Sequence, residues 1–129
     1  MRIQKTFLGF VLMLNLVLNS GCFAVIIGAA AGAGGVAYIR GILVQNVDQD
    51  INRVHDAVID SAKKLGLLIS SDVLNVHSAI IKGSYSDGKT FVVNLDALTE
   101  HATKIAIRIG VFGDEARSRT ILNTIMERL

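Results

Sequence analysis

The chain has 129 residues, of which 51% are apolar and 19% are charged, and its formal net charge is +2. This length accommodates one ordinary domain, and this composition excludes a disordered chain or an acidic tail. Arg2 and Lys5 belong to an expected leader, and without them the thirteen basic residues fall to eleven and equal the eleven acidic ones. A neutral domain with no stripe of basic and aromatic residues lacks an electrostatic footprint for phosphate backbones, so we expect no nucleic-acid partner.

The first residues are typical of a secretory signal. Arg2 and Lys5 supply a basic start, residues 7–18 form an apolar core, and no charged residue follows Lys5 until Arg40. An apolar core of about twelve residues is too short to span a bilayer comfortably. We therefore expect residues 1–21 to be a signal peptide.

A single cysteine, Cys22, directly follows Ser20 and Gly21. A lone cysteine is commonly a small buried hydrophobic residue, but its place after a basic start and an apolar core favours lipidation. One cysteine also excludes an intramolecular disulfide and a cluster of metal-binding thiolates.

The residues Leu18 to Cys22, L-N-S-G-C, resemble the lipobox of bacterial lipoproteins, although Asn19 occupies the position at which the motif usually has leucine. The resemblance implies a diacylglyceryl group on the sulfur of Cys22 and cleavage just before it. Two or three acyl chains, such as palmitate, give stable anchoring without a transmembrane helix. By resemblance to lipoprotein sorting in two-membrane bacteria, Phe23 after the cysteine implies delivery to the outer membrane, facing the periplasm.

Residues 22–37 are expected to be the lipidated cysteine and an apolar tether rich in glycine and alanine. Ala24, Gly28 and Gly32 recur at intervals of four and would form one stripe of small residues on a helix. Such a stripe permits close packing between membrane helices. The alternative to a tether, or to a helix lying in the membrane interface, is therefore self-association of a membrane-inserted helix through Gly28 and Gly32.

From residue 38 the pattern becomes that of a small α+β domain, which we expect to span residues 38–129. Residues 39–47 predict an edge or first strand interrupted by Arg40 and Gly41. A helix follows, capped by Asp48 or Asp50 and stopped by Gly66. Its apolar positions recur at intervals of three and four: Ile51, Val54, Val58, Ala62 and Leu65.

Short strands are expected after this helix, over residues 67–70, 75–85 and 90–95. The turn between the last two contains Asp87 and Gly88, a strong hairpin signal because both residue types adopt positive φ readily. Ile80 and Ile81 are adjacent, so only one of them can face a one-sided core, and the sequence leaves the register open.

Residues 103–112 alternate and predict a half-buried antiparallel strand. Its inner face would consist of Ile105, Ile107, Ile109 and Val111. Gly113, Asp114 and Glu115 then open a helix with acidic residues at its positive end, and Glu115 can meet Arg119 one turn later. The apolar side of this helix would consist of Ile121, Leu122, Ile125, Met126 and Leu129.

The resulting order is strand, helix, three or four strands, helix. We predict an α+β fold in which a small antiparallel sheet carries both helices on one face, preceded by the signal and apolar segment. About ninety residues suffice for such a core.

The chain resembles an uncharacterised family of small bacterial lipoproteins. Three places carry the resemblance: the lipobox followed by G-A-A-A-G-A-G-G-V-A-Y, the helix ending K-K-L-G-L, and the C-terminal I-R-I-G-V-F-G-D-E-A-R-S-R-T-I-L. The resemblance covers nearly the whole chain. It implies localisation and architecture but supplies no mechanism.

Three histidines are the first candidates for catalysis: His55 in the expected helix, His77 near a strand and His101 in a turn. None has the spacing of metal ligands, so we predict no metal and no cofactor. We expect each to be solvated or locally hydrogen-bonded. The run Ser70 to Asp72 beside His77 could suggest a hydrolase, but no G-x-S-x-G motif is present, and we interpret the run as a turn.

A more specific candidate than the histidines is an anion or partner site near a strand-to-helix corner, formed by Arg108, Arg117 and Arg119. Arginine binds carboxylate or phosphate groups bidentately, and free backbone N–H groups at the start of a helix attract anions. The alternative is that these arginines only pair with Asp114 and Glu115.

The leading hypothesis is a non-enzymatic lipoprotein of the cell envelope, anchored by acylated Cys22, whose domain is an interaction or structural module for an unidentified envelope protein. The alternative is an oligomeric protein inserted in the membrane through its glycine stripe. An envelope enzyme is the less favoured third hypothesis, because it would require a polar cleft containing one of the histidines.

Overall fold

The computed structural model describes residues 35–129. The predictions for the signal peptide, Cys22 and the stripe of Gly28 and Gly32 lie outside these residues. The elements in chain order are β1 (Ala37–Ile39), β2 (Ile42–Val47), α3 (Ile51–Lys64), β3 (Leu68–Leu74), β4 (Ser78–Ser84), β5 (Thr90–Thr99), β6 (Ala102–Ile109) and α4 (Glu115–Met126).

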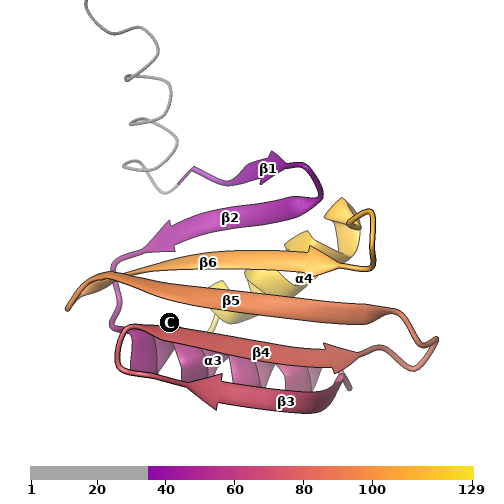
Figure 1. The fold of residues 1–129 in the computed structure, drawn as a ribbon, viewed down its shortest axis with the longest axis horizontal. Coiled ribbons are helices and arrows are strands. Elements are labelled where there is room, and N and C mark those ends of the chain that lie inside the picture. The colour runs from indigo at the N-terminus through magenta and orange to yellow at the C-terminus, as the bar shows by residue number, and fades with distance from the viewer. Residues whose placement is uncertain (1–34) are drawn as a thin grey trace, which may run out of the picture. The chain divides into compact units, whose positions relative to one another are not determined.

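The strands form one six-stranded sheet in the order β1-β2-β6-β5-β4-β3, and every neighbouring pair is antiparallel. Both helices lie behind the sheet in Figure 1, α3 behind β3 and β4 and α4 behind β6 and β2. The α+β fold with two helices on one face is therefore confirmed, with four strands between the helices and two before the first.

The first of these strands corrects the sequence prediction. Residues 39–47 form the hairpin of β1 and β2, in which Ile39 pairs with Ile42. Arg40 and Gly41 form the turn, with φ angles of 52° and 83°. Two positive φ angles match the twist of the flanking strands, so the two residues reverse the chain where a single interrupted strand was expected.

Helix α3 begins and ends where local chemistry predicts. Of the two expected caps, Asp50 is the one used, and its carboxylate accepts the backbone N–H groups of Asn52 and Arg53 at 3.0 Å each. Gly66 follows the helix with a φ of +70°, a conformation that favours glycine. The predicted apolar positions pack against the sheet: Ile51, Val54, Val58 and Ala62 are buried and Leu65 is partly buried.

The edge strand β3 overturns one interpretation. The run Ser70 to Asp72 is part of β3 and is no turn, and the chain turns at residues 75–77 instead. Every residue of β3 is exposed, and the pairing with β4 shifts between Ile69 and Ser71. An exposed, bulged edge strand lacks the alternation of apolar residues on which sequence prediction depends.

Strands β4 and β5 settle the register that the sequence left open. Ile81 is 0% exposed and faces the helices, whereas Ile80 is 40% exposed on the other face. The turn predicted between these two strands is present, but of Asp87 and Gly88 only Gly88 has a positive φ, of 86°, because the turn spans residues 85–89 and is longer than a two-residue hairpin turn. Strand β5 continues to Thr99, where the prediction ended at residue 95.

Strand β6 ends at Ile109, three residues earlier than predicted. Gly110 has a φ of +69° and turns the chain, so Val111 does not join the inner face with Ile105, Ile107 and Ile109. These three isoleucines are fully buried beneath the helices, as the alternation predicts.

Helix α4 starts as predicted, with Asp114 as its cap, because the carboxylate of Asp114 accepts the N–H of Arg117 at 3.1 Å. Ile121, Leu122 and Ile125 are buried. Met126 is exposed, contrary to the prediction, because it lies about 100° around the helix from Ile125.

Candidate functional site

Arg117 lies at the corner where the turn between β4 and β5 meets the start of α4. Its guanidinium donates to the Oδ2 of Asp87 at 2.7 Å and lies 3.6 Å from the Oδ2 of Asp114. The same group lies over the ring of Tyr85, 4.7 Å from its centroid. Lys89 adds a second cation 3.4 Å from Asp114. The corner is thus a network in which the cations face carboxylates of the protein itself.

The charges of this corner stabilise each other's ionised forms. The hydrogen bond from Arg117 lowers the pKa of Asp87, and the backbone N–H of Arg117 lowers the pKa of Asp114. Asp87 in turn raises the pKa of Arg117. Burial raises the pKa of Tyr85 above its usual value of 10.0.

The structure separates the three arginines of the predicted anion site. Arg119 pairs with Glu115 one turn away at 2.9 Å, as expected. Arg108 extends from the sheet face that the helices leave open and donates to the backbone oxygen of Arg40 at 3.1 Å. Arg117 and Arg119 therefore have the acidic partners of the alternative interpretation, whereas Arg108 lies at a different place. An anion or partner site at these residues stays a prediction.

His55 was expected to be solvated or locally bonded, and this expectation is wrong. It is only 9% exposed, and its Nε2 lies 2.7 Å from the Oδ1 of Asp72, seventeen residues away in β3. Its Nδ1 lies 3.6 Å from Asp56, beyond hydrogen-bond distance. The pair braces α3 against the edge strand. Sequence reasoning missed it because Asp72 was assigned to a turn.

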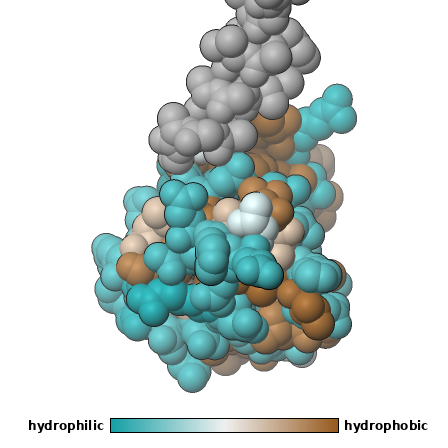
Figure 2. Space-filling model, turned by 90° about the vertical axis from the view of Figure 1, so that its left-hand side faces the viewer, coloured by the Kyte–Doolittle hydropathy of each residue, from teal (hydrophilic) through white to brown (hydrophobic). Residues whose placement is uncertain are grey.

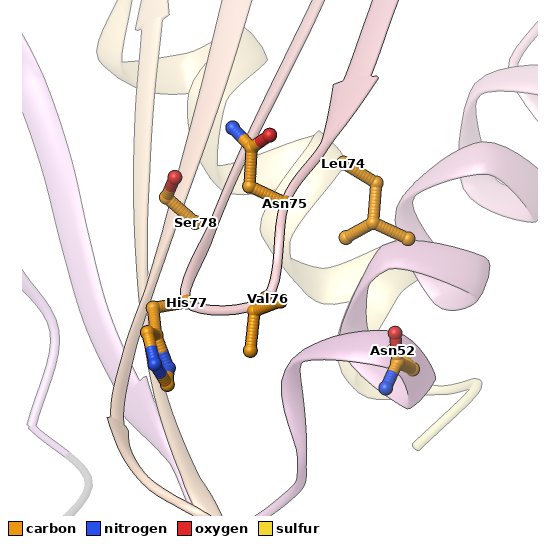
Figure 3. Close-up of a pocket in the computed structure, with 6 residues that line it drawn as sticks. All are labelled: Asn52, Leu74, Asn75, Val76, His77 and Ser78. Carbon is orange, nitrogen blue, oxygen red and sulfur yellow. The ribbon is translucent and has the colours of Figure 1, made fainter.

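His77 lines two neighbouring hollows at the end of the sheet that carries the β3–β4 and β5–β6 turns. The first is lined by Asn52, Leu74, Asn75, Val76, His77 and Ser78, and the second by Asp50, Ile51, Asn52, Val76, His77, Ala97, Leu98, Thr99 and Glu100. In Figure 3, Leu74 is turned toward α3, while Val76 and His77 extend from the turn.

These hollows offer amides, one imidazole and exposed apolar groups. Asp50 is occupied as the cap of α3, which leaves His77 and Glu100 as the remaining side chains of acid–base type. Figure 2 views this end of the molecule and shows apolar patches among polar side chains.

His101 lies in the turn between β5 and β6. Among residues 35–129 no group of three His, Cys, Asp or Glu residues could hold a metal ion.

The sheet face opposite the helices is not covered by any element of residues 35–129 (Figure 1). Across it run Val44, Ala106, Asn94, Ile80 and Val73, one from each of five neighbouring strands. Lys104 and Asp96 form an ion pair of 3.5 Å on this face. In the part of the chain that the structure describes, no helix has the length and apolar character to cross a membrane.

The geometry defines a small α+β protein with a six-stranded antiparallel sheet and two helices on one face. Comparison with family models then places the chain: it belongs to the family described as "Protein of unknown function (DUF3568)", whose model matches residues 5–128. Membership of an uncharacterised family that spans nearly the whole chain is thus confirmed. A search among curated proteins found no match.

Proposed function

We propose that this protein is a lipid-anchored protein of the bacterial cell envelope whose α+β domain is a non-enzymatic interaction or structural module. One observation carries the proposal. The only cysteine of the chain, Cys22, follows a basic start, an apolar core and the pair Ser20 and Gly21, and it lies within the uncharged stretch between Lys5 and Arg40. That arrangement is typical of a lipidated N-terminus.

The distance along the chain from Cys22 to the domain sets how far an anchored domain could reach from the membrane. The first strand begins at Ala37, fifteen residues after Cys22, and the residues between them carry no charge. At about 3.5 Å per residue, such a segment reaches roughly 50 Å at most. Acyl chains on Cys22 would therefore keep the domain close to one membrane surface, in our proposal the periplasmic face of the outer membrane.

Two clusters of titratable groups support a non-enzymatic role, although His77 and Glu100 line an open hollow. His55 is engaged with Asp72, and the cations of the Arg117 corner face carboxylates of the protein. A catalytic acid–base group instead needs access to a substrate within hydrogen-bond reach. In this role the domain would bind another protein of the cell envelope. Capture of that partner from the native envelope would identify it.

Intact mass spectrometry of the protein purified from membranes tests the anchor. We expect a chain that begins at Cys22 and carries the added mass of acyl groups. The variant Cys22→Ala should leave the domain folded and release it when membranes are washed with carbonate. An uncleaved and unmodified chain would contradict the proposal.

The spacing of Ala24, Gly28 and Gly32 favours a second candidate, a membrane-inserted protein that self-associates through this stripe. Crosslinked dimers or larger species that disappear in Gly28→Leu and Gly32→Leu variants would support it. A monomer in detergent and unchanged crosslinking in membranes would refute it.

A further inference from the structure

Val111 and Phe112 are the most exposed large apolar residues of the described chain. Their side chains are 82% and 93% exposed, at the tip of the loop between β6 and α4. Phenylalanine gains far more than most residues from leaving water. Because Val111 and Phe112 are adjacent, they expose one continuous apolar surface, which makes the loop tip a candidate contact point.

The backbone of this loop is held in place from both sides. The N–H of Gly110 donates to the carbonyl of Thr90 at 2.8 Å. A Cβ on Gly41 would lie 2.7 Å from the carbonyl oxygen of Phe112, and one on Gly113 would lie 2.6 Å from the carbonyl oxygen of Gly41. The turn between β1 and β2 and the loop between β6 and α4 thus press directly against each other, and Phe112 is presented by a packed backbone.

Two arginines accompany this apolar tip. Arg108 reaches the backbone oxygen of Arg40 at 3.1 Å, which places both residues beside the loop. Within residues 35–129 no carboxylate lies at ion-pair distance from either guanidinium, and the same holds for Arg53, Lys63 and Lys82 elsewhere on the domain. Arg40 and Arg108 differ from those three in lying beside the exposed apolar tip. The tip therefore has two cations that the described protein leaves uncompensated.

Arg40 occupies an unfavourable backbone position. Its φ of 52° is in the left-handed region, where asparagine and glycine are preferred and other side chains are strained. A strained residue with an uncompensated charge suggests that the arginine side chain has a use outside the fold. Ile39, the preceding residue, is also exposed.

We propose that Ile39, Val111 and Phe112 insert into the interface of a lipid bilayer while Arg40 and Arg108 bind the phosphates of its headgroups. Apolar side chains flanked by arginine match that interface, where hydrocarbon lies just beneath a layer of phosphates. An anionic surface attracts each nearby cation further. This inference rests on the proposed lipid anchor, because Arg40 follows Cys22 by only eighteen residues.

A unique fluorescent reporter tests the insertion. The chain contains no tryptophan, so Phe112→Trp in the full acylated protein gives a single signal. The matched control is Val76→Trp, at a position that is 79% exposed in the turn between β3 and β4. Both variants are reconstituted into vesicles of phosphatidylcholine and phosphatidylglycerol, with and without brominated acyl chains.

We expect the tryptophan at position 112 to emit at shorter wavelength and to lose most of its intensity to brominated lipid. The tryptophan at position 76 should keep the emission of a water-exposed indole. Equal, water-like emission from both positions would overturn the proposal. Shielding of position 112 from aqueous quenchers without quenching by brominated lipid would also overturn it, because it would indicate a protein partner.

The arginines are tested on the same reporter. Arg40→Asn removes the charge and supplies a residue that the turn prefers, so the fold should be retained. In anionic vesicles, we expect the ratio of membrane-inserted to water-exposed tryptophan at position 112 to fall by about fivefold. Arg53→Gln, at an exposed position of α3, is the matched control and should change nothing. An Arg40→Asn variant that inserts as well as the parent would refute the phosphate contact.

Mass spectrometry of the same samples separates the two proposals. An acylated Cys22 with a water-exposed tryptophan at position 112 would refute the insertion and leave the anchor intact. An unmodified Cys22 would refute the anchor, whatever the tryptophan reports.

Discussion

Replacing Gly113 by alanine should destabilise the domain strongly, for two separable reasons. The backbone of Gly113 has a φ of +84°, which costs an ordinary residue about 1–2 kcal/mol. In addition, the new Cβ would meet the Cα of Gly41 and lie 2.6 Å from both the carbonyl oxygen of Gly41 and the hydroxyl of Tyr38. Forcing such packed atoms apart costs about 1–3 kcal/mol.

Gly66 supplies the matched control. Its φ of +70° imposes the same backbone penalty, but a Cβ there would have nothing within 4 Å. Alanine also restricts the unfolded chain, which returns about 0.4–1 kcal/mol in both variants. We therefore expect a loss of about 1 kcal/mol for Gly66→Ala and of about 3 kcal/mol for Gly113→Ala.

Thermal unfolding of the two variants, followed by circular dichroism in detergent, measures this difference. For a domain of this size 1 kcal/mol corresponds to about 4–8 °C in Tm. Gly66→Ala should lower Tm by about that amount, and Gly113→Ala by about three times as much. Equal shifts would refute the close packing of the two turns. They would also remove the argument that Phe112 is presented on a rigid backbone.

Two further predictions follow from the core and from the Arg117 corner. Ile81→Asp should unfold the domain because it buries an unpaired charge. Ile80→Asp, one residue away on the open face, should leave a cooperative thermal transition. Similar melting curves for the two variants would contradict the register of β4. The pKa of Asp87 lies below its usual 3.8 because Arg117 bonds to the ionised form, so this bond stabilises the fold above pH 4, and its contribution is lost as the pH falls through the lowered pKa. Urea midpoints measured from pH 7 down to pH 3 should therefore fall less steeply in Asp87→Asn than in the parent, and parallel curves would show that the bond adds no stability.

Much of the secondary structure could be predicted because its signals are local. Asp50 and Asp114 cap the helices through their own neighbouring N–H groups, and Gly88 supplies the positive φ of the turn between β4 and β5. The alternation of Ile105, Ile107 and Ile109 likewise predicts a strand with one buried face, and it does so without information from the rest of the fold. These signals act over a few residues, so the sequence contains them in full.

The sequence predictions are wrong where contacts between residues far apart in the chain determine the local structure. Strand β6 ends at Ile109 because the chain turns at Gly110, which brings Phe112 and Gly113 against Gly41, although the predicted strand continued to Phe112. The run Ser70 to Asp72 has the composition of a turn, yet pairing with β4 makes it a strand. In both cases, tertiary contacts override local preference.

The sequence by itself determined the α+β class, the presence and approximate position of both helices and the position of Cys22 after a signal-like segment, because composition, periodicity and capping are local properties of the chain. Only the tertiary structure decided that His55 meets Asp72, that Arg108 and Arg117 lie at different places, and that two exposed apolar side chains stand beside two uncompensated arginines. These relations join residues from different strands and turns. Their distances depend on how the sheet is ordered and registered, which no short stretch of the sequence encodes.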